Sequence, residues 1–267
     1  MDSLSKLENE SIYIIRESFS LHSNLAVLWS MGKDSTVLLW LCRKAFFGHI
    51  PFPVIHIDTS YKFDEIYRFR DHLTKEWKLN LIIQRNEKAL AENMGPARFD
   101  TLACCHALKT AALKEAIKNL KLDALLLGIR RDEHSIRSKE RYFSPRDLDS
   151  HWNYRDQPPE LWDLYESSAT DDTHVRVHPL LHMNEVDIWR YIQRENIPTN
   201  PLYFAQGGQR FRSIGCKTCC KAVPSEVASV EEIVNELETS RVAERTGRAQ
   251  DKEDEYTMQR LRSLGYM

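Results

Sequence analysis

The chain has 267 residues, of which 42% are hydrophobic and 28% charged, a composition typical of a folded globular protein rather than a disordered, fibrous or membrane protein. Its 37 lysines and arginines nearly balance its 39 aspartates and glutamates, so no large basic surface is available to bind nucleic acid unaided. No stretch reaches the roughly 18 uninterrupted apolar residues of a membrane span, and the N-terminus alternates acidic and apolar residues. We therefore expect a cytoplasmic protein.

Apolar runs alternate with amphipathic segments along the first three quarters of the chain. Helical spacing of apolar residues is found at 4–20, 36–47, 63–77, 107–120 and 184–195. Short apolar runs typical of buried strands are found at 25–29, 53–57, 80–83, 124–127 and 175–177. Strands that alternate with helices predict an α/β fold with a doubly wound parallel sheet.

We assign residues 1–200 to this α/β domain and residues 201–267 to a C-terminal extension that carries a CxxC motif and a charged tail. Between Arg130 and Thr173 the sequence is rich in charge, proline and tryptophan. A connection of this length inside a compact domain is usually a functional loop or lid.

A polar turn, residues 30–36, separates the first expected strand from its helix. The first turn of a helix exposes free N–H groups at the positive end of the helix dipole, which favours phosphate. Gly32 lets the backbone approach an anion closely, Lys33 adds a positive charge, and Asp34 is placed to orient Mg²⁺ or to cap the turn. Neither the Walker loop nor the dinucleotide fingerprint is present. The residues that we expect at the phosphates are Ser30, Gly32, Lys33, Asp34, Ser35 and Thr36.

Polar residues follow two further strands of the expected sheet. Ligands of open α/β sheets bind at the carboxyl ends of the strands, so these residues should lie near the same site. Asp58 is a candidate partner for a ribose hydroxyl, and Gly128 leaves room for the adenine or the α phosphate. Arg130 and Arg131 are candidates for neutralising charge in the transition state. In the alternative interpretation, Asp58 caps a turn and both arginines are solvated.

Four of the six cysteines form two motifs, the pair Cys104-Cys105 and the CxxC of Cys216 and Cys219. Without a signal peptide these thiols are expected to be reduced, so their clustering suggests a metal site. Adjacent cysteines suit neighbouring irons of a [4Fe–4S] cluster better than one tetrahedral zinc ion. Cys220 is either a spare ligand or a thiol that handles sulfur, and Cys42 lies in an apolar helix and is expected in the core.

Segments spread over nearly the whole chain resemble the PAPS reductase and sulfate adenylyltransferase small-subunit (CysD-like) family, and SxGxDS within the polar turn resembles the PP-loop of ATP pyrophosphatases. The resembling segments are SMGKDSTVLLWLCRKAF, PFPVIHIDTSYKF, RRDEHSIRSKERYFSPRD, QPPELW, RVHPLL and GRAQDKE. The resemblance implies an adenine nucleotide alpha hydrolase-like fold and an enzyme that cleaves ATP between its α and β phosphates. Sulfate would be the acceptor, with adenylyl sulfate and pyrophosphate as products and a GTPase large subunit as partner.

The cysteine set departs from the CysD pattern and looks like the cluster signature of adenylyl-sulfate reductases. Those enzymes carry a nucleophilic cysteine near the C-terminus, whereas no cysteine follows Cys220 here. The sequence is also similar to the DndC-like and SspD-like ATP pyrophosphatases of DNA phosphorothioation, in which ATP activates a DNA phosphate and a cysteine desulfurase supplies sulfur. A third hypothesis is a nucleotide-sensing or scaffolding subunit without turnover, which the intact phosphate loop disfavours.

Overall fold

The computed structural model describes residues 2–135, 137–147, 149–155, 157–161, 164–165, 174–239, 244 and 265. The helices are α1 (Ser3–Leu21), α2 (Lys33–Ala45), α3 (Asp64–Glu76), α4 (Glu87–Ala91), α5 (Thr101–Cys105), α6 (Ala112–Leu120), α7 (Glu185–Glu195) and α8 (Val230–Thr239). Most of the charged tail after residue 239 and part of the 130–173 segment lie outside the described residues.

Six strands form the central sheet in the order β3-β2-β1-β4-β8-β5. They are β1 (Leu25–Leu28), β2 (Val54–Ile57), β3 (Leu81–Gln84), β4 (Ala124–Leu126), β5 (Phe143–Arg146) and β8 (His174–Val177). The five strands that the sequence predicts are mutually parallel, and the order reverses between β1 and β4. The α/β prediction is confirmed, and the reversal creates the crevice in which such sheets bind ligands.

One edge of the sheet differs from the prediction of a purely parallel arrangement. β5 pairs antiparallel with β8, with Phe143 opposite Val177 and Arg146 opposite His174. The sequence did not predict this strand because Pro145 lies within it, and proline is tolerated in strands mainly at edges. The segment after Arg130, expected as a loop or lid, therefore contributes an edge strand.

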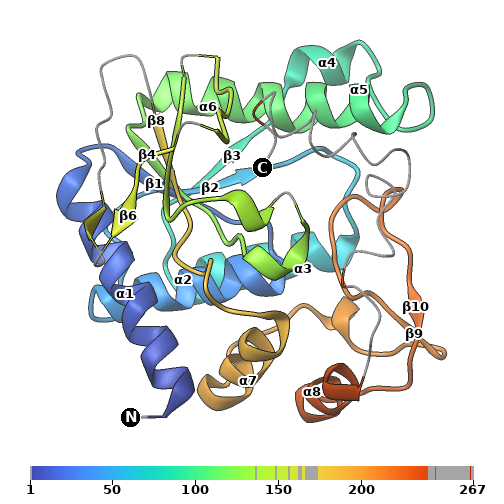
Figure 1. Cartoon of the computed structure of the whole chain (residues 1–267). Coiled ribbons are helices and arrows are strands. Elements are labelled where there is room, and N and C mark those ends of the chain that lie inside the picture. The colour runs from blue at the N-terminus through green and yellow to red at the C-terminus, as the bar shows by residue number, and fades with distance from the viewer. Residues whose placement is uncertain are drawn as a thin grey trace.

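Helices cover both faces of the sheet, which explains why β1, β2, β4 and β8 are buried at every position. Figure 1 shows α4, α5 and α6 on one side of the sheet and α1, α2, α3 and α7 on the other. Alternate strand residues point to opposite faces. Val27 and Trp29 therefore join the core under α1, α2 and α7, whereas Ala26 and Leu28 pack with α6.

The C-terminal extension is joined to the α/β body by packing. Leu202, Ile214 and Leu237 belong to the same buried cluster as Val27 and Trp189. A short hairpin of β9 (Gln209–Arg210) and β10 (Val223–Pro224) precedes α8, and a second one pairs β6 (Glu160–Leu161) with β7 (Leu164–Tyr165). The boundary at residue 200 stays a prediction, because the described part of the extension shares the main core.

Candidate active site

The polar turn after β1 leads directly into α2. Gly32 is the residue before the helix, with φ −76° and ψ 163°, and it has no side chain to cap the first turn. Of the N–H groups of that turn, the one of Lys33 donates to the Tyr203 hydroxyl at 2.9 Å. Met31 adopts a positive φ of 61°, which bends the chain sharply between the strand and the helix. The first N–H groups of a helix have no intrahelical partner, so a helix start of this kind is suited to binding an anion.

Serine hydroxyls line this turn and hold its shape. The Ser30 N–H group donates to Ser35 Oγ at 3.2 Å, the two serine hydroxyls lie 3.0 Å apart, and the Ser35 hydroxyl donates to the Gly32 carbonyl at 3.2 Å. The Thr36 hydroxyl instead accepts from the Trp29 indole at 3.1 Å and is buried. Its expected contact with phosphate stays a prediction.

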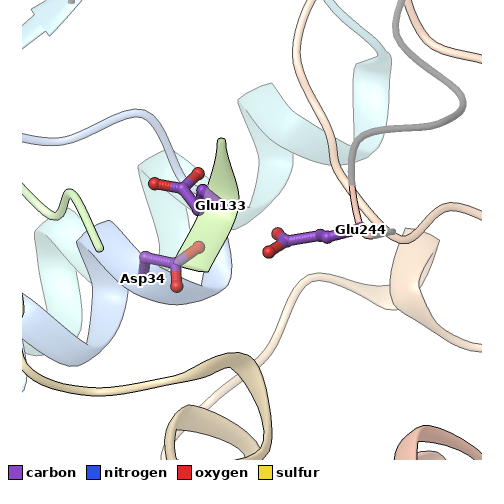
Figure 2. Close-up of side chains that lie close together, drawn as sticks. All are labelled: Asp34, Glu133 and Glu244. Carbon is purple, nitrogen blue, oxygen red and sulfur yellow. The ribbon is translucent and has the colours of Figure 1, made fainter. Parts of the chain in front are cut away.

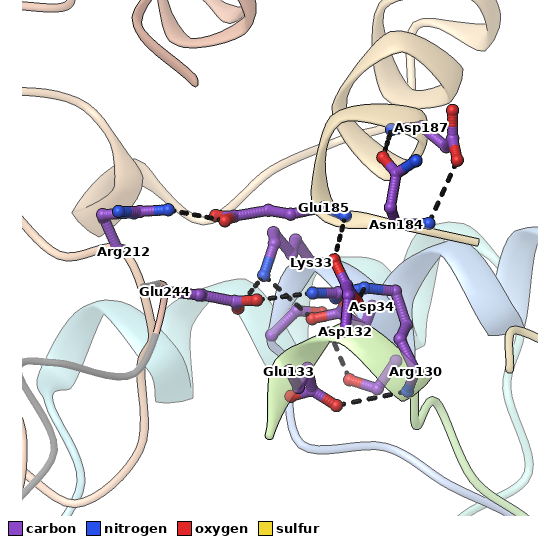
Figure 3. A network of polar contacts seen from close by, with 12 residues as sticks. Lys33, Asp34, Arg130, Asp132, Glu133, Asn184, Glu185, Asp187, Arg212 and Glu244 are labelled. Atoms are coloured by element: carbon purple, nitrogen blue, oxygen red, sulfur yellow. Dashed lines mark hydrogen bonds and ion pairs between the residues drawn. The ribbon is translucent and has the colours of Figure 1, made fainter. Parts of the chain in front are cut away.

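Two cations meet at the start of α2 and are paired with carboxylates there. The ammonium group of Lys33 lies 3.0 Å from Asp34 and also contacts Glu244. The Arg130 guanidinium contacts Asp34, lies 2.5 Å from Glu244 through Nη2 and donates from Nε to Asp132 at 2.9 Å. Figure 3 shows how these side chains converge from distant segments of the chain. The structure thus brings Lys33, Asp34 and Arg130 together, and their expected roles at the phosphates stay predictions.

Burial and ion pairing act in opposite directions on the pKa values of Arg130 and Glu244. Burial acts to lower the pKa of Arg130, but Glu244, Glu133 and Asp132 outweigh it and raise that pKa. Burial acts to raise the pKa of Glu244, but Arg130 and Lys33 hold it below its ordinary value. Both side chains are therefore charged at neutral pH.

Three carboxylates approach one another beside the two cations. Oxygen atoms of Asp34, Glu133 and Glu244 lie within 4.8 Å of one another, and Figure 2 shows the three groups converging. Both oxygens of Asp34 already contact Lys33 or Arg130. Oxygen ligands of this type suit Mg²⁺, which also takes ligands from the phosphates of a bound nucleotide.

An open cavity lies beside the polar turn. It is lined by Ser30, Gly32, Asp34 and Ser35 from the turn and by Gly128 after β4, and it extends to Cys216. The cavity therefore lies at the strand reversal, where open α/β sheets bind their ligands.

Gly128 is in close contact with the turn. A Cβ atom at this position would lie 2.9 Å from the Ser35 main-chain nitrogen and 3.0 Å from the Asp34 carbonyl carbon. Only glycine allows β4 and the start of α2 to approach so closely.

Two other predicted residues lie apart from the cavity. Asp58 is buried and accepts from the Ser60 N–H group at 2.9 Å, from the Tyr67 hydroxyl at 2.9 Å and from Arg85 Nη2 at 2.6 Å. The Arg131 guanidinium stacks over the Tyr142 ring at 5.1 Å. Their expected contacts with ribose and phosphate stay predictions, and in the structure both side chains bind protein groups.

The four motif cysteines line a second, smaller cavity of about 240 Å³. Cys104 and Cys105 end α5, immediately before a π-helical turn at His106–Ala111, a distortion that often marks functional sites. Cys216 and Cys219 reach the cavity from the extension, where Cys216 pairs with Lys62 across an isolated bridge. Cys216 lines both cavities, so the two sites are adjacent.

A hydrogen bond and two nearby ammonium groups favour the thiolate form of Cys216. The hydrogen bond from Cys219 and the nearby Lys109 and Lys62 ammonium groups lower the pKa of Cys216 to about 4, against the effect of burial. Burial raises the pKa of Cys104 to about 11.

Comparison with known proteins identifies the family. Residues 24–222 match the phosphoadenosine phosphosulfate reductase domain. Two relatives named sulfate adenylyltransferase subunit 2, from Agrobacterium fabrum and Myxococcus xanthus, are each 40% identical over 98% of this chain and over 92% and 96% of their own lengths. The chain belongs to the phosphoadenosine phosphosulfate reductase domain family.

Solved structures agree with this family at the level of the fold. A phosphoadenylyl-sulfate reductase from Candida auris aligns with a TM-score of 0.56 and 17% identity over 84% of this chain and 98% of that one. FMN adenylyltransferase from Candida glabrata, solved with FMN and an ATP analogue, aligns with a TM-score of 0.59 and 17% identity over 93% of each chain. The resemblance inferred from sequence motifs is confirmed, and so is the fold class.

Sequence reasoning missed several residues of this family member's site. Glu244 lies in the charged tail, Glu133 follows the arginine pair, and Tyr203 accepts a hydrogen bond from the Lys33 N–H group at 2.9 Å. Glu133 lies three residues after Arg130, a local signal that could have found it, whereas Glu244 and Tyr203 reach the turn only through the tertiary fold.

No described helix combines the length and the apolar character needed to cross a lipid bilayer.

Proposed function

We propose that the chain is an adenylating ATP pyrophosphatase of sulfur metabolism that transfers the adenylyl group of ATP to sulfate and releases pyrophosphate. The observation that carries the proposal is the start of α2, where Gly32 offers no capping side chain and Lys33 and Arg130 lie together beside an open cavity. Full-length similarity to sulfate adenylyltransferase subunit 2 supports sulfate as the acceptor.

The geometry suits a reaction in which charge moves to a leaving group. As the bond between the α phosphorus and the bridging oxygen breaks, negative charge grows on the departing pyrophosphate. Lys33, Arg130 and the N–H groups of the first turn of α2 are fixed in place before this charge appears, so they stabilise the transition state without reorganising. Mg²⁺ would enter with the polyphosphate and take ligands from it.

Removal of a polar side chain from the first turn of α2 tests this function. We expect Ser35→Ala and Asp34→Ala to lower pyrophosphate release from ATP by about 100-fold or more, with the fold retained. Ser138→Ala is the matched control, because the exposed Ser138 hydroxyl donates to the nearby Ser135 carbonyl at 2.6 Å and does not line the cavity. Pyrophosphate and adenylyl sulfate would be measured with sulfate present, with and without a GTPase large subunit. Wild-type rates in both loop variants would remove the proposed site.

We further propose that Cys104, Cys105, Cys216 and Cys219 hold a [4Fe–4S] cluster. All four line one small cavity that includes Leu108 and Pro96. A tetrahedral zinc ion would hold its sulfurs about 3.8 Å apart, given Zn–S bonds of about 2.3 Å. The adjacent pair Cys104-Cys105 suits two neighbouring irons of one cluster better than a single tetrahedral ion, and this pairing supports a cluster over zinc.

Iron analysis after anaerobic purification tests the cysteine site. We expect about four irons per chain and a brown protein, as for one cubane cluster. Cys219→Ala should lose the iron, whereas Cys220→Ala should retain it, because Cys220 does not line the small cavity. Colourless wild-type protein with one zinc per chain would contradict the proposal.

The cysteine site also favours a second candidate function, in which the activated acceptor receives sulfur. In this alternative, ATP activates a DNA phosphate and a cysteine desulfurase with DNA-modification proteins supplies sulfur. The adjacency of the two cavities at Cys216 is the observation in its favour. Stimulation of pyrophosphate release by DNA and a desulfurase, but not by sulfate, would select it.

A further inference from the structure

The carboxylate of Glu244 lies where a phosphate group would be expected. Its side chain is only 5% exposed and contacts both cations of the turn, Lys33 through Oε1 and Arg130 through Oε2. Figure 3 shows it reaching toward Lys33 and Arg130. Glu244 is separated by more than a hundred residues from either cation, so local sequence does not impose this contact.

Carboxylates and phosphates are recognised by the same groups. A guanidinium fork and an ammonium group bind the oxygens of either anion through charge-assisted hydrogen bonds. Lys33 and Arg130 are the two cations that the proposed function assigns to the leaving pyrophosphate. In the structure, both are already bound to one carboxylate.

We propose that Glu244 is an internal competitor for polyphosphate, occupying the anion position at Lys33 and Arg130 until the phosphates of ATP displace it. The inference rests on the proposed function. Two anions within a few ångströms of each other repel, so polyphosphate and the Glu244 carboxylate cannot share these cations at full affinity. Only molecules in which Glu244 is away from the cations can bind ATP, so the apparent dissociation constant equals the intrinsic one divided by the fraction of such molecules. By the same linkage, Glu244 favours the departure of pyrophosphate after the reaction.

Replacement of Glu244 by glutamine separates charge from shape. Glu244→Gln keeps the size of the side chain and removes its negative charge. We expect Mg²⁺-ATP and Mg²⁺-pyrophosphate to bind about 10-fold more tightly to this variant, measured by calorimetry on the full chain. AMP should bind equally to both proteins, because it lacks the β and γ phosphates. Glu238→Gln is the matched control, since Glu238 is exposed in α8 and pairs with Arg190 at 2.5 Å, away from the turn.

Three outcomes would overturn the inference, and they are distinguishable. Equal and measurable affinity of both proteins for ATP would exclude competition while leaving the proposed function intact. Weaker binding of Mg²⁺-ATP to Glu244→Gln would make Glu244 a ligand of the magnesium complex rather than its competitor. Failure of ATP and pyrophosphate to bind either protein would overturn the phosphate site itself. Glu244→Asp, which keeps the charge but shortens the reach, should give an intermediate affinity and guards against a folding defect in the glutamine variant.

Discussion

Single atoms decide whether the turn after β1 can take its shape. Gly128 is the clearest case, because a Cβ atom there would lie 2.9 Å from the Ser35 nitrogen, a main-chain atom that cannot move without moving the start of α2. The same N–H groups are those that the proposed function directs at phosphate. A side chain at this position therefore acts on the site through the backbone, without touching any ligand.

We expect Gly128→Ala to reduce pyrophosphate release by at least about 10-fold, because it displaces the phosphate-binding N–H groups from their productive positions. Steady-state rates with ATP would measure the effect. Gly48→Ala is the control, since Gly48 has a φ of 98° but open space around it. That variant should lose about 1 kcal/mol of stability and keep its rate. Equal rates for Gly128→Ala and the wild-type protein would show that the close approach is not needed.

At the scale of elements, the sequence predicted α2 as beginning at Thr36, whereas it begins at Lys33. The difference arises because Gly32 precedes the helix without a capping side chain, so the usual signal for a helix start is missing. The shift places Lys33, Asp34 and Ser35 in the first turn, where the N–H groups have no intrahelical partner. The chemistry of the turn was predictable from residue types, but its position relative to the helix was not.

Other elements were obscured by long-range structure. The helix expected over 107–120 begins with α5 and passes through a π-helical turn, which no local spacing indicates. β5 contains Pro145 and forms only because β8 offers an edge. The sequence did not indicate Glu244 as a site residue for the same reason, since only the tertiary fold brings its carboxylate to Lys33 and Arg130. Sequence patterns therefore predicted the parallel strands and the glycine turn, and missed the contacts made between distant segments.

Two buried histidines, one at the start of β8 and one directly after it, predict sensitivity to acid. Burial lowers the pKa of His174 to about 3, aided by Arg176 and Arg146, and burial lowers that of His178 to about 3. Between pH 6.5 and 3 the unfolded chain binds protons that the folded chain excludes. The free energy of unfolding is therefore not reduced by these two histidines above about pH 6.5, and it falls as the pH drops below that value.

We expect the free energy of unfolding to fall below pH 6 by about 3 kcal/mol per pH unit from these two groups together. Urea denaturation at several pH values would measure the slope. His178→Asn should reduce the slope by about half, because it removes one of the two titrating groups. Asparagine can still donate to the Arg141 carbonyl, which the His178 ring contacts at 2.8 Å, so the variant should fold. His72→Asn, on the exposed face of α3, should leave the slope unchanged. A pH-independent stability between pH 7 and 5 would contradict the assignment.

At the scale of the whole molecule, two contacts tie the C-terminal extension to the α/β body beside the cysteines. Cys216 pairs with Lys62 across an isolated bridge, and the Lys217 N–H group donates to the Tyr61 carbonyl at 2.8 Å. The four proposed ligands come from segments more than a hundred residues apart, Cys104-Cys105 before β4 and Cys216 to Cys219 after β9. A cluster bound by both segments would fasten one to the other.

A ligand set drawn from two distant segments exists only in the folded chain, so the binding free energy of the cluster adds to the stability of the fold. We expect removal of iron with a chelator to lower the melting temperature of the anaerobic protein by about 5 °C or more, since 1 kcal/mol corresponds to roughly 2–4 °C for a chain of this size class. Cys220→Ala should show the same loss, whereas Cys219→Ala should melt at the lower temperature before and after chelation. An unchanged melting temperature in wild-type protein that has lost its iron would mean that the cysteine site does not join the two segments.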